Sequence, residues 1–377
     1  MRVETFVFWT AAIIGVWWAA AQDVVRPNTA CVEFNQNIVT KLDSGLLAES
    51  EALLSAALIE KEINFEPSCL ATILHNLANV LALSGRFAEA EGLAQRSIKL
   101  LAAVHSVQNP ALFRPLHLLW STQFLQGERS KARQTFQKMK VLQLAKAQDR
   151  AMLHGAAASE MQVDGRYEEA QREYQKALVA SVEAGRGETG DYAILLTGLG
   201  TQQLFQNRYL EAGATLDLAL SVATSAKDAV PMDLIKILSV RAVLWARQAK
   251  WQAAAQDLKL ALLIADRDAR LDPGELKPLL ANFGYVLRKA HRGKEARAIE
   301  SRVKSINTVP LANAIVDVRE LSKKPIPRNE PNRPVPLKNE FRRQLSNPRR
   351  GSLPGQEPQN RRHNSVPLIG LEYKLCV

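Results

Sequence analysis

Histidine, cysteine, serine and carboxylate side chains carry most catalytic and metal-binding chemistry, so their spacing sets the first limits on function. The chain has no HExxH pattern and no paired Cys-x-x-Cys spacing, so the sequence predicts neither a metal site nor a cofactor. No G-x-S-x-G motif marks a serine nucleophile, and the acidic pair Glu168-Glu169 fits a solvated helix start. We therefore expect a protein that is not an enzyme. The residues considered are His75, His105, His117, His154, His291, His363, Cys31, Cys69 and Cys376.

Two glycine-rich stretches raise the question of a phosphate-binding loop. The segment Gly185–Gly190, GRGETG, lacks the lysine-serine ending of such a loop, and no predicted strand precedes it. The second stretch, Gly198-Leu199-Gly200, lies inside an apolar helical pattern. Both are predicted to serve turns and close packing.

The elements that must position any site follow a repeated pattern, which the segment Asp164–Leu178 shows most clearly. Each repeat has a turn residue between two helical patterns, where a chain reversal needs positive φ. Successive turn residues are 40, 42, 38, 42, 42 and 42 residues apart, which predicts paired helices in about seven units. The turn residues are Gly45, Gly85, Gly127, Gly165, Asn207, Ala249 and His291.

Small residues recur at fixed distances from these turns. Alanine stands five residues after most of them, as at Ala170, and a small residue usually stands seven residues before, as at Ala158. Tyr167 and Tyr174 lie seven apart and so share one helix face, with Ala170 and Ala177 beside them. Small side chains let paired helices approach closely while the rings fill the remaining space.

These residues resemble the signature of the tetratricopeptide repeat, in the 42-residue variant seen in kinesin light chains and in bacterial exported relatives. The resemblance covers roughly Cys31 to Ile306. It implies an all-α fold, a right-handed α-solenoid of about seven helix-turn-helix units, with residues 31–308 as the repeat domain. The pattern departs from the family at Trp120 and Arg129 in the third unit and at Gly293 and Glu300 in the last.

The resemblance also implies a binding surface, because the first helix of each unit lines the concave face in this family. The lining positions lie ten and six residues before the turn residue, and here they are mostly polar and uncharged. A protein or peptide ligand is the partner that this groove implies, and the shortage of Lys and Arg disfavours a clamp for a carboxylate terminus. The expected binding residues are His75, Asn79, His117, Ser121, Ser159, Thr197 and Thr201, with Arg114 beside them, and the remaining lining positions are Gly155, Ser239 and Val243. The alternative is that these residues are merely solvated or hydrogen-bonded between helices.

Cys31 and Cys69 both fall near the start of the first helix in adjacent units. In an oxidising compartment they could pair as a disulfide, and the alternative is two buried free thiols.

The first 21 residues do not belong to the repeats. An apolar run from Phe6 to Trp18 is followed by three alanines that suit a cleavage site, the layout of a secretory signal peptide. The expectation is export to the periplasm or the cell exterior, with a bacterial cell envelope as the setting and residues 22–30 as a linker. The alternative is a retained N-terminal membrane anchor.

After a C-terminal capping segment at residues 309–323, residues 324–377 form a basic, proline-rich tail that is predicted to be disordered. From Leu321 to Val377 there are twelve Lys or Arg and four Asp or Glu, so this part carries +8 of the net +11. The tail is either simply solvated or makes weak contact with an anionic surface; specific nucleic-acid binding is not expected. Two functions remain: a scaffold that binds proteins through its groove, or an envelope tether that binds through its tail.

Overall fold

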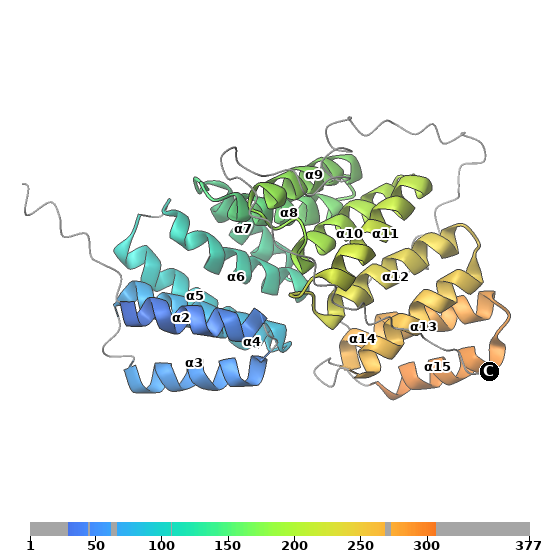
Figure 1. The fold of residues 1–377 in the computed structure, drawn as a ribbon, viewed down its shortest axis with the longest axis horizontal. Coiled ribbons are helices and arrows are strands. Elements are labelled where there is room, and N and C mark those ends of the chain that lie inside the picture. The colour runs from blue at the N-terminus through green and yellow to red at the C-terminus, as the bar shows by residue number, and fades with distance from the viewer. Residues whose placement is uncertain (1–28, 44–45, 62–65, 107, 268–272, 307–377) are drawn as a thin grey trace, which may run out of the picture. The chain divides into compact units, whose positions relative to one another are not determined.

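The computed structural model describes residues 29–43, 46–61, 66–106, 108–267 and 273–306, and these form paired helices (Figure 1). The first helix of each pair is α2 (Thr29–Asp43), α4 (Pro67–Leu83), α6 (Phe113–Leu125), α8 (Ala147–Val163), α10 (Gly190–Phe205), α12 (Pro231–Arg247) or α14 (Pro273–Lys289). The second is α3 (Leu47–Lys61), α5 (Phe87–Val104), α7 (Arg129–Lys140), α9 (Tyr167–Glu183), α11 (Tyr209–Ser225), α13 (Trp251–Arg267) or α15 (Gly293–Ser305). A short 3₁₀ helix, η1 (Pro110–Leu112), precedes α6.

The turn within each described pair has the predicted register. Gly85, Gly127 and Gly165 have positive φ, and so do Asn207, Ala249 and His291 at the same repeat position. The following amide closes the helix end: at Gly165, for example, the N–H of Arg166 donates to the carbonyl of Met161 at 2.9 Å. These six positions confirm the repeat spacing, while Gly45 lies outside the described residues.

Arginine and glutamate fix the start of several second helices. The arginine directly after the turn residue donates from Nε to a glutamate three residues later, at 2.7 or 2.8 Å. A carboxylate in the first turn also complements the positive end of the helix dipole. Glu169, which the sequence already placed at a helix start, therefore belongs to a repeated helix-start pair. The pairs are Arg86–Glu89, Arg166–Glu169, Arg208–Glu211 and Arg292–Glu295.

Helices pack in order, as expected for a solenoid: each second helix contacts its own first helix and the first helix of the next unit. The alanines at the predicted contact positions, among them Ala158, Ala170 and Ala212, are fully buried. Gly198 and Gly200 also serve close packing, because a Cβ at Gly198 would lie 2.3 Å from the Tyr174 ring and one at Gly200 would lie 2.9 Å from Leu216. The core is thus a run of apolar clusters between neighbouring units.

The third unit accommodates the two residues that depart from the repeat signature. Trp120 is buried where most other units have a small residue, and its indole N–H donates to Glu160 of α8 at 2.8 Å. Arg129 lies over the Phe124 ring, 4.0 Å from its centroid. Both departures therefore make specific contacts within the third unit or with the next one. In the last unit, Glu300 pairs with Arg288 of α14.

Several sequence-based predictions fall on residues that the structure does not describe. The signal peptide at 1–21, the capping segment at 309–323 and the basic tail at 324–377 all lie outside the described residues, as do residues 22–28 of the linker. The linker was predicted to end at residue 30, whereas α2 already begins at Thr29. Among the described helices, none combines the length and apolar character needed to span a membrane.

Candidate functional site

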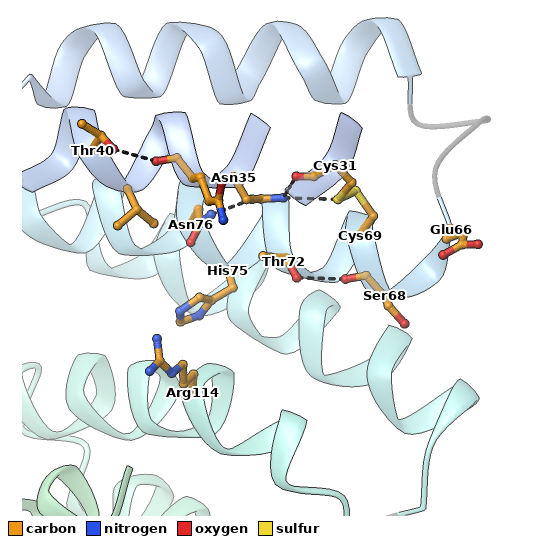
Figure 2. Close-up of a pocket in the computed structure, with 12 residues that line it drawn as sticks. Cys31, Asn35, Thr40, Glu66, Ser68, Cys69, Thr72, His75, Asn76 and Arg114 are labelled. Carbon is orange, nitrogen blue, oxygen red and sulfur yellow. Dashed lines mark hydrogen bonds between the residues drawn. A yellow bond between two sulfur atoms is a disulfide. The ribbon is translucent and has the colours of Figure 1, made fainter. Parts of the chain in front are cut away.

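A cavity of about 770 Å³ opens where the first helices of the first three units come together (Figure 2). We call it the first-helix groove. Side chains one or two helical turns apart face it from α2 and α4, and Arg114 faces it from α6. It is defined by Cys31, Asn35, Gln36, Val39, Thr40, Glu66, Ser68, Cys69, Thr72, His75, Asn76 and Arg114.

An amide ladder joins the two walls of this groove. The Nδ2 of Asn76 on α4 donates to Oδ1 of Asn35 on α2 at 2.8 Å. Asn35 in turn donates from Nδ2 to the carbonyl of Cys31 at 2.9 Å. Because side-chain amides carry both donors and acceptors, the ladder fixes α2 against α4 and still leaves hydrogen-bonding capacity on the wall.

The structure joins Cys31 and Cys69 in a disulfide, with their Cα atoms 6.1 Å apart. The bond ties α2 to α4 at one end of the groove, next to the ladder (Figure 2). Of the two alternatives that the sequence left open, the structure has the bonded pair. The first unit is therefore held to the second by a covalent link as well as by packing.

His75 lines the α4 side of the groove, whereas His117 of α6, also an expected binding residue, is not among the lining residues. Burial, with the Arg114 guanidinium as a second cause, lowers the pKa of His75 to about 4, and the same causes lower the pKa of His117 to about 4. Both imidazoles are therefore neutral at neutral pH. Figure 2 shows the His75 ring and the Arg114 side chain pointing toward one another. The Nδ1 atom of His75 is buried and has no hydrogen-bond partner among the described residues.

Arg114 is already engaged on its other side. Its Nε donates to Asp149 at 3.2 Å and its Nη2 donates to Gln148 at 3.1 Å. Asp149 is itself buried, so the ion pair compensates a carboxylate that would be costly to leave alone. The guanidinium thus links α6 to α8 and is not a free cation for a ligand.

The remaining predicted binding residues do not form one continuous open surface. Ser121 and Ser159 are partly exposed, and each hydroxyl donates to a carbonyl of its own helix. Thr197 and Thr201 are buried, and their hydroxyls likewise donate to main-chain carbonyls at 2.8 Å. The prediction that these two threonines line a groove is therefore wrong in this structure. Asn79 and Gly155 are partly exposed, whereas Ser239 and Val243 are buried.

The groove also includes residues that the sequence-based prediction missed. Asn35 lies ten residues before Gly45, the same offset that selected His75, so the repeat pattern contained this signal. Thr72 and Asn76 lie on the same α4 face as His75 but at other offsets. Only the packing of α2 against α4 brings them to the cavity.

No metal-binding arrangement stands out in the part of the chain that the structure describes: no three His, Cys, Asp or Glu side chains gather as a group that could hold an ion. His154 is the one histidine here with a close carboxylate, its Nδ1 lying 2.7 Å from Glu173. Hydrogen bonds from Lys176 and His154 outweigh the effect of burial and lower the pKa of Glu173. This cluster links α8 to α9 away from the groove.

Comparisons with known proteins agree with the repeat architecture. A tetratricopeptide repeat family model matches residues 69–139. The chain is similar in structure to Rap protein complexed with competence and sporulation factor, with a TM-score of 0.56 and 12% identity over 77% of this chain and 75% of that one. This likeness shows the fold. No curated protein sequence matches the chain.

Two further solved structures are similar to the chain. One is BtubC (BKLC) from P. vanneervenii, with a TM-score of 0.43 and 20% identity over 66% of this chain and 96% of that one. The other is a tetratricopeptide repeat protein from Parabacteroides merdae ATCC 43184, with a TM-score of 0.44 and 17% identity over 78% of this chain and 98% of that one.

Proposed function

We propose that the chain is a tetratricopeptide-repeat scaffold that binds an extended segment of a partner protein in the first-helix groove. The observation that carries the proposal is the groove itself, an open cavity lined by hydrogen-bonding side chains from three successive units. Rap protein, which shares the fold, is known in complex with competence and sporulation factor.

The exposed part of the lining suits a peptide main chain. Gln36, Thr40 and Thr72 are exposed, and the two threonine hydroxyls donate to carbonyls of their own helices at 3.0 Å. The Thr72 oxygen keeps the capacity to accept, and the Gln36 amide can both donate and accept. An extended peptide presents N–H and C=O groups along its length, which such side chains can pair with.

The buried part of the lining supports the same proposal. A buried nitrogen without a hydrogen bond is uncommon in proteins, and Nδ1 of His75 is such an atom among the described residues. Because that atom is closed to solvent in this structure, a segment bound on this wall can satisfy it only if the imidazole ring turns toward the groove. Because His75 is neutral at neutral pH, the partner group there should be neutral as well.

The charge of the groove selects against charged ligands. Its ionised residues are Arg114, which pairs with Asp149, and Glu66, at the start of α4. Recognition of a terminal carboxylate would require unpaired cations that the described lining does not have. We therefore propose an internal, largely uncharged segment as the ligand.

A peptide selection tests this function. Twelve-residue peptides displayed on phage are selected against the purified chain, and their affinities are compared between Gln36→Glu/Thr72→Glu and the matched control Asn37→Glu/Ala102→Glu. All four positions are exposed, but only Gln36 and Thr72 line the groove. Affinity should fall at least about tenfold in the groove variant and stay within about twofold in the control. Failure to select any peptide, or equal affinity in both variants, would show that the groove is not the binding site.

Export is part of the proposal. The apolar run Phe6–Trp18 followed by Ala19-Ala20-Ala21 supports a cleaved signal peptide, and the Cys31–Cys69 disulfide fits an oxidising compartment. N-terminal sequencing of the protein from periplasm or culture medium should give a start near Gln22. An intact Met1 terminus in the membrane fraction would instead establish an anchored protein.

The alternative function is an envelope tether, favoured by the net charge of +8 between Leu321 and Val377. Binding to an anionic surface through this segment should weaken steeply as salt concentration rises, whereas binding in the neutral groove should change little. A partner that is lost on deleting residues 324–377, and that still binds the groove variant, would favour the tether.

A further inference from the structure

A second groove, of about 300 Å³, lies where α5, α6 and α7 meet, and it shares no lining residue with the first-helix groove. We call it the second-helix groove, since both of its walls are second helices. The lining side chains of α5 are spaced i, i+3 and i+4, and those of α7 are spaced i, i+3 and i+7, so each wall is one helix face. The walls are Gln95, Ile98 and Lys99 on α5 and Lys131, Gln134 and Lys138 on α7.

The floor of this groove is apolar and firmly held. Leu116 and Leu119 of α6 form it, next to the apolar Ile98 of the α5 wall. At one end, Gln123 of α6 donates to Glu91 of α5 at 2.9 Å and accepts from the hydroxyl of Thr135 of α7 at 2.8 Å. These bonds join all three helices, so the spacing of the walls is set before any ligand arrives.

The rim of the groove is positively charged. Helix α7, RSKARQTFQKMK, holds five basic residues and no acidic one. Lys131 is paired with Glu128 at 2.9 Å, whereas Lys99 and Lys138 make no ion pair with any described residue. Both of the latter are exposed, one on each wall. The groove thus presents an apolar floor between two cations without counter-ions in the described chain.

We propose that the second-helix groove binds an acidic amphipathic segment of a partner protein. Its carboxylates would pair with Lys99 and Lys138, and one or two of its apolar side chains would cover Leu116 and Leu119. The cavity lies at the lower end of the roughly 300–1,000 Å³ typical of small-molecule sites, so it suits side chains of a larger partner. The site is separate from the first-helix groove and would let one scaffold hold two segments.

Other occupants fit this surface less well. The chain's own C-terminal part carries +8 from Leu321 to Val377, so the lysines would repel it. A symmetric contact between two copies would set one basic α7 against the other. A membrane surface would need protruding apolar side chains, whereas Phe136 and Met139 of α7 are buried.

The test uses phage-displayed 16-residue peptides rich in Asp, Glu and Leu, selected against the purified chain at about 0.15 M salt. The selected peptides are then measured on Lys99→Glu/Lys138→Glu and on the control Lys140→Glu/Lys259→Glu, which makes the same charge change at exposed positions outside the groove. The groove variant should bind at least about tenfold more weakly, with the control within about twofold. Gln36→Glu/Thr72→Glu should bind normally, which separates this site from the proposed function.

Three results would overturn the proposal. The first is that no acidic peptide is selected. The second is that both charge-reversal variants lose the same affinity, which would indicate non-specific electrostatic attraction and not a defined site. The third is that the chain binds phosphatidylglycerol vesicles and that this binding depends on Lys99 and Lys138 as strongly as peptide binding does. That result would assign the surface to a membrane.

Discussion

Glycine 198 offers a sharp test of how closely α9 and α10 pack. A Cβ added to Gly198 would lie 2.3 Å from Cε1 and 2.4 Å from Cζ of Tyr174, whereas non-bonded carbons prefer about 3.5–4.0 Å. The Tyr174 ring cannot move aside freely, because it is buried. Gly198→Ala must therefore push the two helices or the ring apart.

The expected magnitude combines two opposing effects. Overpacking a core costs about 1–3 kcal/mol, while replacing glycine by alanine inside a helix gains about 0.5–1 kcal/mol. Gly198→Ala should therefore lower the free energy of unfolding by roughly 0.5–2 kcal/mol. Gly92 of α5 is the matched control, since an added Cβ there meets nothing within 4 Å. Gly92→Ala should raise the stability by about 0.5–1 kcal/mol.

Urea denaturation followed by far-ultraviolet circular dichroism measures both changes. The midpoint should fall for Gly198→Ala and rise for Gly92→Ala. In a Tyr174→Leu background, most of the cost of Gly198→Ala should disappear, because the ring that it meets is gone. Equal stabilisation by the two alanines would refute the close approach of α9 and α10.

Three further outcomes concern stability and can be checked by urea denaturation, with amide exchange added for the last. Ala249 has φ +56, so Ala249→Gly should remove left-handed strain and raise the free energy of unfolding by about 1 kcal/mol; no change would argue against that turn conformation. Folding lowers the pKa values of His75 and His117 from 6.5 to about 4, so the unfolded chain binds more protons between these pH values. The free energy of unfolding should therefore decrease as the pH falls from 6.5 toward 4, and this decrease should be smaller in His75→Gln/His117→Gln. The Cys31–Cys69 disulfide joins residues 38 apart in the sequence. Its reduction should lower the free energy of unfolding by roughly 4 kcal/mol and speed amide exchange first in α2 and α3.

The sequence by itself was sufficient to predict the repeat architecture. Turn residues such as Asn207 and Ala249 were placed by their distance from Gly165, and both have the positive φ that this position requires. Periodicity is a local property of the chain, since each unit must bury the same helix faces against its neighbours. Alanine at the contact positions was predictable for the same reason, and Ala170 is fully buried.

The accessible part of the binding surface was decided only by the tertiary structure. Thr197 and His75 occupy the same repeat position, yet Thr197 is buried and His75 lines an open groove. The sequence offset fixes the direction of a side chain from its own helix, but exposure depends on how far the neighbouring helices stand apart. The second-helix groove has the same origin: Lys99 and Lys138 are 39 residues apart in the chain and become two walls of one site only because α5 and α7 both pack on α6.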